Sequence, residues 1–407
     1  MGTSMQREVG KGGVAIGRHR LCRALPLLLA ASAACSDGRD ATRLLLPEPP
    51  PGEPLPGEPH PADGALEVPA FLGLPLTEAD SDSSPPLLSQ TGAFVDLERL
   101  DAAPGILPYS VQSPLWSDGA QKRRWMALPS GGHIGFSEEG AWSFPEGTVF
   151  IKQFGMVLDE RTPDVVRRLE TRFLVAAQGG DVYGLVYKWD DDQRDARLLL
   201  DGGEDVLDIV GADGSVRQQR YTYPSPRACG ACHSERSGFF MGARTAQLNG
   251  EYHASAGEPS ADEAGENQLE AWAALDMFDT QFTDAEPAAH ERLAPLADAA
   301  APLEARVRSY WDSNCSSCHN AASPFPSWDA RFSTPLEEQG VLLAAPHSGG
   351  APDGVRLIVP GDPEHSLIYL RSQSDQPGTR MPPLLRNRVD DRYVELLREW
   401  IESLPAP

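Results

Sequence analysis

Two short stretches of the sequence share the pattern Cys-x-x-Cys-His: Cys229, Cys232 and His233, then Cys315, Cys318 and His319. Cysteines three positions apart lie on one face of a helical turn, where both thiols can form thioethers with the vinyl groups of one porphyrin. The histidine that follows can offer a ring nitrogen to the iron. This pattern is the attachment signature of c-type haem, so the sequence predicts two covalently bound haems.

Zinc sites and redox disulfides use similar cysteine pairs, but their usual contexts differ. A four-cysteine zinc ribbon separates its pairs by roughly 15–20 residues, whereas 82 residues lie between Cys232 and Cys315. A thioredoxin-like pair needs a βαβ context, whereas the sequence around Cys229 is rich in proline and loop-forming residues. Neither kind of site requires the histidines, so haem attachment is the interpretation that uses all six residues.

A methionine is the predicted sixth ligand of the second haem iron. Met381 lies 62 residues after His319, in a segment that Pro382 and Pro383 keep out of helical geometry. Its thioether is a soft ligand, and ligation by histidine and methionine raises the haem potential. A core methionine that only fills space is the alternative.

The first haem has several candidate sixth ligands. Met277, 44 residues after His233, is the favoured one. Met241 and His253 are alternatives, as is an iron with an open or water-bound position. The sequence alone does not choose among them.

The first 35 residues resemble a bacterial lipoprotein signal. A basic stretch that ends at Arg23 precedes the apolar run ALPLLLAASAA, which is too short to span a bilayer but suits a signal peptide. Cys35 is the predicted lipidation site, and an ordinary cleaved signal is the alternative. Because Ser36, not Asp, follows it, we expect a periplasmic or cell-surface lipoprotein in the outer membrane.

The chain of 407 residues carries a net charge of −24. This charge argues against nucleic-acid binding, which needs a cationic surface, and is compatible with a basic protein partner or simply with solubility. Residues 36–88 are rich in Pro, Glu, Asp, Gly and Ser. Such a segment buries too little apolar surface to fold, so we predict a disordered linker between the membrane anchor and the folded part.

The remaining chain changes from a strand-like to a helical pattern. Residues 89–225 contain alternating runs at 148–158, 167–177 and 181–189, with a turn sequence at 178–181. We therefore expect a multidomain protein whose mainly-β N-terminal domain is a sandwich or barrel. Residues 226–300 form the first haem-binding segment and include a predicted helix at 268–278.

Residues 301–407 are predicted to form an all-α domain. A helix over 301–315 places Leu303, Val307 and Tyr310 on one face. Asp362 is a plausible N-cap for a second helix. The last helix, over 390–404, is amphipathic, with an apolar stripe that includes Tyr393, Leu397, Trp400 and Leu404.

The order of helix, Cys-x-x-Cys-His, long loops, methionine loop and C-terminal helix is similar to that of class I cytochromes c. The resemblance implies a cytochrome c-like fold for 301–407, with Tyr310 and Trp400 where the first and last helices cross. More widely, segments at 108–129, 142–154, 167–175, 183–199, 223–234 and 245–249 resemble an uncharacterised family of exported bacterial di-haem proteins. Membership of that family would imply haem binding and export, but it would not indicate which reaction, if any, the protein catalyses.

Two charged motifs in the β-rich part have alternative interpretations. The stretch SPLWSDGAQKRRW, at 113–125, suits a binding loop or a cationic contact with haem propionates, but an aromatic core with solvated charges is favoured. The stretch KWDDDQRDA, at 188–196, has carboxylates that suit calcium. It lacks the spacing of a calcium-binding loop, so a turn with exposed charges is favoured.

The leading functional hypothesis is an exported di-haem c-type cytochrome that exchanges electrons with redox-protein donors and acceptors. One alternative is a di-haem oxidoreductase of the peroxidase kind, with an open position at the first haem. Another is a substrate-binding β domain fused to the haem relay of a dehydrogenase. Whether the protein is an enzyme stays open, and the electron carrier is favoured.

Overall fold

The computed structural model describes residues 72, 74–75, 78–252, 266–283, 286–323, 328–347, 354–384 and 386–405. Cys35, the predicted signal and most of the predicted linker lie outside the described residues, as does His253. Contacts divide the chain between Glu58 and Pro59, so every described residue belongs to one compact unit.

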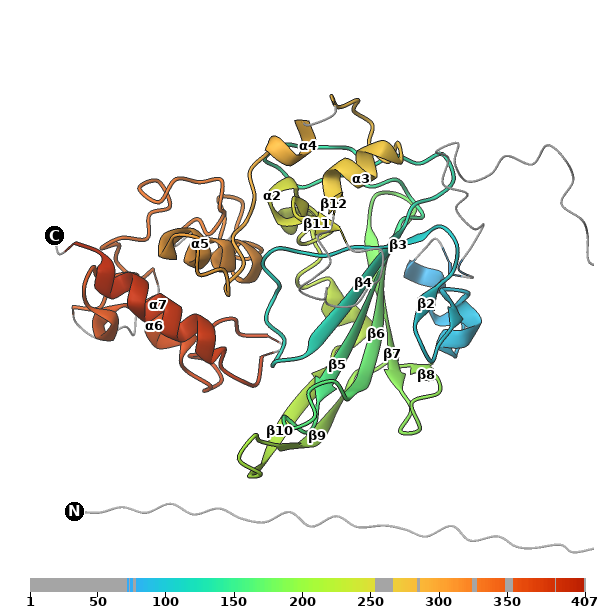
Figure 1. The fold of residues 1–407 in the computed structure, drawn as a ribbon, viewed down its shortest axis with the longest axis horizontal. Helices are drawn as coiled ribbons and strands as arrows, with labels where there is room; N and C mark the ends of the chain where they lie inside the picture. The colour runs from blue at the N-terminus through green and yellow to red at the C-terminus, as the bar shows by residue number, and fades with distance from the viewer. Residues whose placement is uncertain are drawn as a thin grey trace, which may run out of the picture. The chain divides into compact units, whose positions relative to one another are not determined.

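Six antiparallel strands form the main sheet, and each strand pairs with the next one in sequence. The strands are β3 (Ile106–Pro108), β4 (Gln121–Ala127), β5 (Val149–Val157), β6 (Val166–Ala176), β7 (Val182–Trp189) and β8 (Ala196–Leu198). The strands follow one another across the sheet from β3 to β8. Within the described residues, the two edge strands β3 and β8 do not pair with each other. Figure 1 shows the strands side by side. The prediction of a mainly-β N-terminal region is confirmed.

The turn between β6 and β7 lies where the sequence predicts it. Gly179 and Gly180 have φ values of +92° and +88°, a backbone conformation that glycine adopts without steric cost. They connect strands that pair through Ala176 and Val182.

Three two-stranded sheets accompany the main one. They pair β1 (Phe94–Asp96) with β2 (Asp101–Ala102), β9 (Gly203–Val210) with β10 (Val216–Tyr223), and β11 (Glu251–Tyr252) with β12 (Glu266–Asn267). The β9–β10 hairpin extends beyond the end of the sheet at which β4 begins (Figure 1). Its residues Leu207, Ile209 and Tyr221 pack on Phe154 of β5.

The folded part begins before residue 89. Leu72 and Leu88 are buried in the apolar cluster on one face of the sheet, together with Trp125 and Phe173. The Tyr187 hydroxyl donates a hydrogen bond to the Pro85 carbonyl, at 2.9 Å. Two short 3-10 helices, Glu78–Ser83 and Leu88–Thr91, lie in this segment. The described end of the predicted linker is therefore packed on the sheet, because its few leucines complete the core.

Short helices follow the sheet in the chain: α1 (Pro226–Cys229), α2 (Thr245–Leu248), α3 (Gln268–Ala274) and α4 (Glu286–Ala289), with a 3-10 turn at Glu235–Ser237. Asn267 caps α3 by accepting hydrogen bonds from the Leu269 and Glu270 N–H groups. The helix predicted over 268–278 ends early, and Asp276 has a φ of +54°. A left-handed residue cannot continue a right-handed helix.

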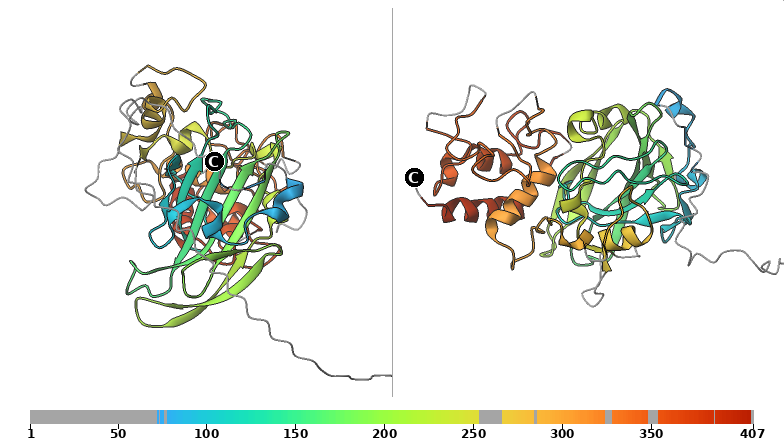
Figure 2. Two further views of the ribbon diagram at one scale, coloured as in Figure 1. Left: turned by 90° about the vertical axis from the view of Figure 1, so that its right-hand side faces the viewer. Right: turned by 90° about the horizontal axis from the view of Figure 1, so that it is seen from above.

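The C-terminal helices are α5 (Leu303–Asn314), α6 (Leu367–Ser372) and α7 (Asp391–Ser403), with a 3-10 turn at Pro363–His365. They lie together and apart from the sheet (Figures 1 and 2). The rings of Tyr310 and Tyr393 stack at 3.7 Å between centroids, and Trp311 meets Trp400 edge to face at 5.3 Å. Tyr310 and Trp400, which the resemblance places where the first and last helices cross, both lie in the contact between α5 and α7. Each pairs there with another aromatic residue.

The structure describes the predicted cap at Asp362 and the charged turn at 188–196. Asp362 accepts a hydrogen bond from the His365 N–H and so caps the 3-10 turn Pro363–His365, whereas α6 begins only at Leu367, after Ser366. In the 188–196 turn, Asp190 and Asp191 form ion pairs with Arg197 and Arg167, as expected for a turn with charged side chains. Among the described helices, none has the length and apolar character needed to cross a membrane.

Candidate functional site

Both cysteine motifs form the same backbone turn. The Cys229 carbonyl accepts hydrogen bonds from the N–H groups of Cys232, at 3.1 Å, and His233, at 2.8 Å. The Cys315 carbonyl accepts the corresponding bonds from Cys318, at 3.0 Å, and His319, at 2.8 Å. In each motif, one turn of helical hydrogen bonding therefore joins the two thiols and the histidine.

All four thiols are free, and three of them have raised pKa values. Burial raises the pKa of Cys229 and Cys232, and it raises the pKa of Cys315 to about 12. These thiols therefore stay protonated and unpaired at neutral pH. A free pair three residues apart is what thioether formation requires of the protein.

The His233 ring is oriented by the backbone. Its Nδ1 lies 2.7 Å from the Phe239 carbonyl oxygen. Burial lowers the pKa of His233 to about 4, against the opposing effect of this hydrogen bond, so the ring is neutral at pH 7. A carbonyl only accepts, so the proton lies on Nδ1 and the lone pair on Nε2. Metal-binding histidines commonly have this arrangement.

His319 is supported by an aromatic ring and a backbone contact. Its imidazole stacks on Trp328, with 5.4 Å between ring centroids. The His319 carbonyl accepts a hydrogen bond from the Ala330 N–H, at 2.9 Å. Burial lowers the pKa of His319, so this ring is also neutral at pH 7.

The first motif packs directly on the main sheet. A β-carbon built at Gly184 of β7 would collide with Cys229 Sγ and lie 2.9 Å from Cys229 Cβ. Gly184 thus leaves the space that the Cys229 side chain occupies. Sequence reasoning missed this residue, because the chain order does not tell which strand faces the motif.

The two motifs lie near each other. Burial raises the pKa of Cys232, and the neighbouring Cys318 adds to that effect. Arg244, eleven residues after His233, forms an ion pair of 2.7 Å with Asp312 of α5. The same guanidinium lies 3.3 Å from Ser316 Oγ, inside the second motif. Arg244 therefore connects the segment after the first motif to the second motif.

The SPLWSDGA segment contacts the C-terminal helical part on both sides of the second motif. The Trp116 backbone N–H donates to Asn314 Oδ1 at 2.7 Å, and its indole N–H donates to the Arg388 carbonyl at 2.9 Å. Asp118, only 2% exposed, accepts from the backbone N–H groups of Asn387, at 2.7 Å, and Arg388, at 2.8 Å. The favoured interpretation of solvated charges is therefore wrong for Asp118, because its carboxylate satisfies backbone donors between two parts of the fold.

The side chain of Arg386 and a backbone hydrogen bond support the segment that contains Met381. Its N–H donates to the Arg371 carbonyl at 3.1 Å. The buried Arg386 guanidinium donates to the carbonyls of Met381 and Ser374. The Met381 side chain is partly exposed. The methionine loop is thus fixed by hydrogen bonds to its backbone.

The two methionines near the first motif have different surroundings. Met277 is 1% exposed and packs with Trp142, Trp272 and Phe278. Met241 is partly exposed. The structure thus explains Met277 as a core residue, and we leave it out of the proposed ligand set.

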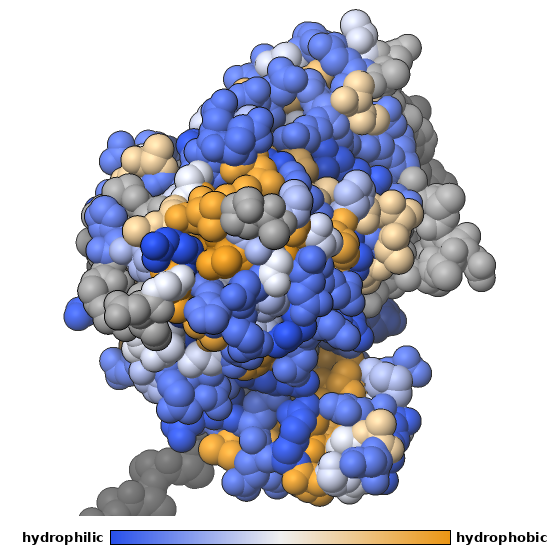
Figure 3. All heavy atoms as spheres, turned by 90° about the vertical axis from the view of Figure 1, so that its left-hand side faces the viewer, coloured by the Kyte–Doolittle hydropathy of each residue, from blue (hydrophilic) through white to orange (hydrophobic). Residues whose placement is uncertain are grey.

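Apolar side chains are exposed in the C-terminal part: Leu342, Leu343 and Leu384. Figure 3 shows the face on which the C-terminal helices lie, with hydrophobic residues gathered in its middle and hydrophilic ones around them.

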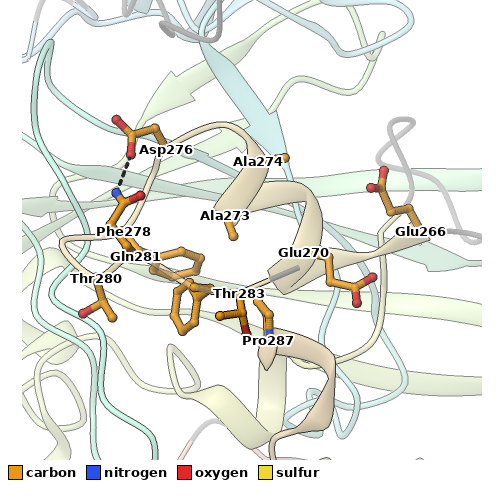
Figure 4. Close-up of a pocket in the computed structure, with 11 residues that line it drawn as sticks. Glu266, Glu270, Ala273, Ala274, Asp276, Phe278, Thr280, Gln281, Thr283 and Pro287 are labelled. Carbon is orange, nitrogen blue, oxygen red and sulfur yellow. Dashed lines mark hydrogen bonds between the residues drawn. The ribbon is translucent and has the colours of Figure 1, made fainter. Parts of the chain in front are cut away.

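A separate cavity of about 310 Å³ lies between α3, α4 and the loop that joins them (Figure 4). Its lining includes the acidic residues Glu266, Glu270 and Asp276, and Gln281 donates a hydrogen bond to Asp276. Neither cysteine motif contributes to the lining. The cavity is thus distinct from the cysteine sites.

No protein-family model, curated protein or solved structure matches this chain. The site is therefore interpreted from its own geometry: two matching turns with free thiols, and neutral histidines beside them.

Proposed function

We propose that this protein is an exported di-haem c-type cytochrome that transfers electrons. The observation that carries the proposal is the matching pair of turns, each with free thiols and a neutral histidine. Haem attached there supplies one-electron redox chemistry at its iron. The chain's own part is to hold each haem through two thioethers and to direct a histidine nitrogen at the metal.

The residues proposed to hold the first haem are Cys229, Cys232 and His233. The carbonyl of Phe239 keeps the proton on Nδ1 of His233, which leaves Nε2 as the ligand atom. The second haem is assigned to Cys315, Cys318 and His319, with Met381 as its sixth ligand. The stacking of His319 on Trp328 supports this assignment because it restricts rotation of the imidazole.

We further propose a cytochrome c-like domain for 301–407. Support comes from the joined α5 and α7 helices, the second motif at the C-terminal end of α5, and the separate loop that contains Met381. The contacts of Arg244 with Asp312 and Ser316, which connect the segment after the first motif to the second motif, support electron exchange between the haems within one chain. Export, lipidation at Cys35 and a redox-protein partner complete the proposal.

A haem enzyme with an open first site is the second candidate. It is favoured by one observation, the burial of Met277 among aromatic rings. That packing removes the favoured candidate ligand, so Met241 and an open position are the alternatives that remain for the first iron within the described residues.

The first experiment is intact mass together with absorption spectra of the haem-matured protein, oxidised, reduced and with carbon monoxide. Two haems per chain, both low spin and unchanged by carbon monoxide, are expected for the electron carrier. One high-spin haem that binds carbon monoxide would instead favour the enzyme. A chain without covalent haem contradicts both.

A further inference from the structure

Four cations lie on one face of the main sheet. Arg124 of β4 pairs in register with Lys152 of β5, and Lys152 pairs with Arg172 of β6. Lys122 lies two residues before Arg124 on the same face, because strand side chains alternate. We call these four residues the cationic row. It crosses three adjacent strands of the sheet.

Such a row is unfavourable without an anion. Like charges placed opposite each other on neighbouring strands repel. Glu170 forms an ion pair with Arg172, and its carboxylate also accepts a hydrogen bond of 2.7 Å from the Tyr221 hydroxyl. Glu170 thus lies beside the row, and Lys188 of β7, in register with Glu170 on the same face, pairs with Asp205.

Lys152 lies at the centre of the row and is partly buried. Its ammonium has no hydrogen bond or ion pair within the part of the chain that the structure describes. Burial lowers the pKa of Lys152 to about 7, and Arg124 and Arg172 lower it further in the same direction. Glu170 acts in the opposite direction, but its ion pair is with Arg172. Lys152 therefore lies between two cations, and an anion placed beside it would favour its charged form.

Apolar residues border the row along the strands. Met126 and Leu174, on one side, belong to an apolar cluster with Phe240. Phe154, on the other side, packs with Leu207 and Tyr221. A ligand with both carboxylates and a large apolar surface matches this face better than a small inorganic anion does.

The first cysteine motif lies on the same face. Cys229 packs over Gly184, and Gly184 pairs in register with Leu174, two residues from Arg172. Burial raises the pKa of Cys229, and Arg172 acts in the opposite direction, as a nearby cation does. The cationic row and the first motif are therefore neighbours across β6 and β7.

We propose that the cationic row binds the propionate carboxylates of the haem attached to Cys229 and Cys232. The inference rests on the proposed function and adds residues from β4, β5 and β6 to the first site. The β-rich region then has a defined role, which is to neutralise the anionic edge of that haem. A free anion such as phosphate is the competing occupant.

The test compares Lys152→Gln with Arg123→Gln in the haem-matured full chain. Arg123 is the matched control, because it lies on the opposite face of β4, over the Trp125 ring. Loss of a cation beside a propionate favours the oxidised haem. We expect Lys152→Gln to lower the reduced-to-oxidised ratio of one haem roughly tenfold at fixed potential, or about 59 mV for a one-electron couple. The other haem and the control should change much less.

Arg124→Gln serves as a second variant, with the same expected direction, if Lys152→Gln fails to fold. If the haem potentials of Lys152→Gln and Arg123→Gln are equal, and mass shows two haems in each, the propionate assignment is overturned and the proposed function still stands. A chain without covalent haem would overturn both.

Thermal unfolding distinguishes a free anion from the propionates. The haem-matured protein and Lys152→Gln are compared in phosphate and in chloride at equal ionic strength. Equal stability in the two salts is expected when propionates occupy the row. Stabilisation of the parent protein by phosphate, lost in Lys152→Gln, would assign the row to a free anion and overturn the proposal.

Discussion

The two cysteine motifs have the same turn but different supports. The first follows a helix of four residues and packs on the sheet over Gly184. The second follows a helix of twelve residues, α5, whose aromatic side chains pack against α7. The short sequence pattern is enough to form the turn, while the surrounding fold is unrelated in the two cases. Substitutions in the supports should therefore affect one site and leave the other intact.

Removal of the thiols should have the largest effect and should separate the two sites completely. Cys315→Ala with Cys318→Ala is expected to remove one covalent haem, and Cys229→Ala with Cys232→Ala the other, because each pair supplies both thioethers. Intact mass counts the haems. An unchanged haem count in either double variant would refute attachment at that motif.

Gly184→Ala should affect the first site alone. The added methyl group would collide with Cys229 Sγ, and overpacking of this kind costs about 1–3 kcal/mol. We expect reduced haem attachment at Cys229 and Cys232, measured by mass of proteolytic fragments, with the second site fully loaded. Gly203→Ala is the control, since its β-carbon would meet only Leu199, at 3.9 Å. Equal loading in the two variants would count against the packing argument.

Met381→Ala should change the second haem without removing it. Loss of the thioether ligand is expected to give a high-spin iron or a lower potential, because ligation by methionine raises the potential. Absorption spectra and a redox titration measure both. Met277→Leu is the matched control and should leave the second haem unaltered. The same spectrum before and after Met381→Ala would mean that another residue is the ligand.

Asp118→Ala should leave both haems attached and weaken the contact between the SPLWSDGA segment and the C-terminal helical part. It leaves the N–H groups of Asn387 and Arg388 without their acceptor, which costs about 1–3 kcal/mol. Chemical denaturation measures the loss. Asp118→Asn keeps a carbonyl acceptor and tolerates the φ of +56°, so it should be much closer to the parent. An equal loss of stability in Asp118→Ala and Asp118→Asn would mean that the negative charge of Asp118, and not its hydrogen bonds, stabilises this contact.

Local patterns predict much of the secondary structure. Alternation identified β5, β6 and β7, and helical periodicity identified α5 and α7. The 268–278 helix was predicted too long, because nothing in its composition marks the left-handed residue that follows it.

Local sequence patterns could not predict contacts between residues that are far apart in the sequence. Asp118 is 269 residues from Asn387, and the cationic row exists only in the register of three strands. Gly184 was missed for the same reason. The turn at each cysteine motif could be predicted because its hydrogen bonds join residues within a five-residue segment. Haem attachment at these turns stays a prediction.

The contact of Asp118 with the chain near its C-terminus bears on the order of folding. Closing a loop of this length costs conformational entropy, and contacts of large sequence separation slow folding. Synthesis also makes the sheet available long before Asn387 and Arg388 exist. The Asp118 carboxylate therefore lacks these two donors until residues 387 and 388 have been synthesised, so the contact forms only after the second cysteine motif is already part of the chain.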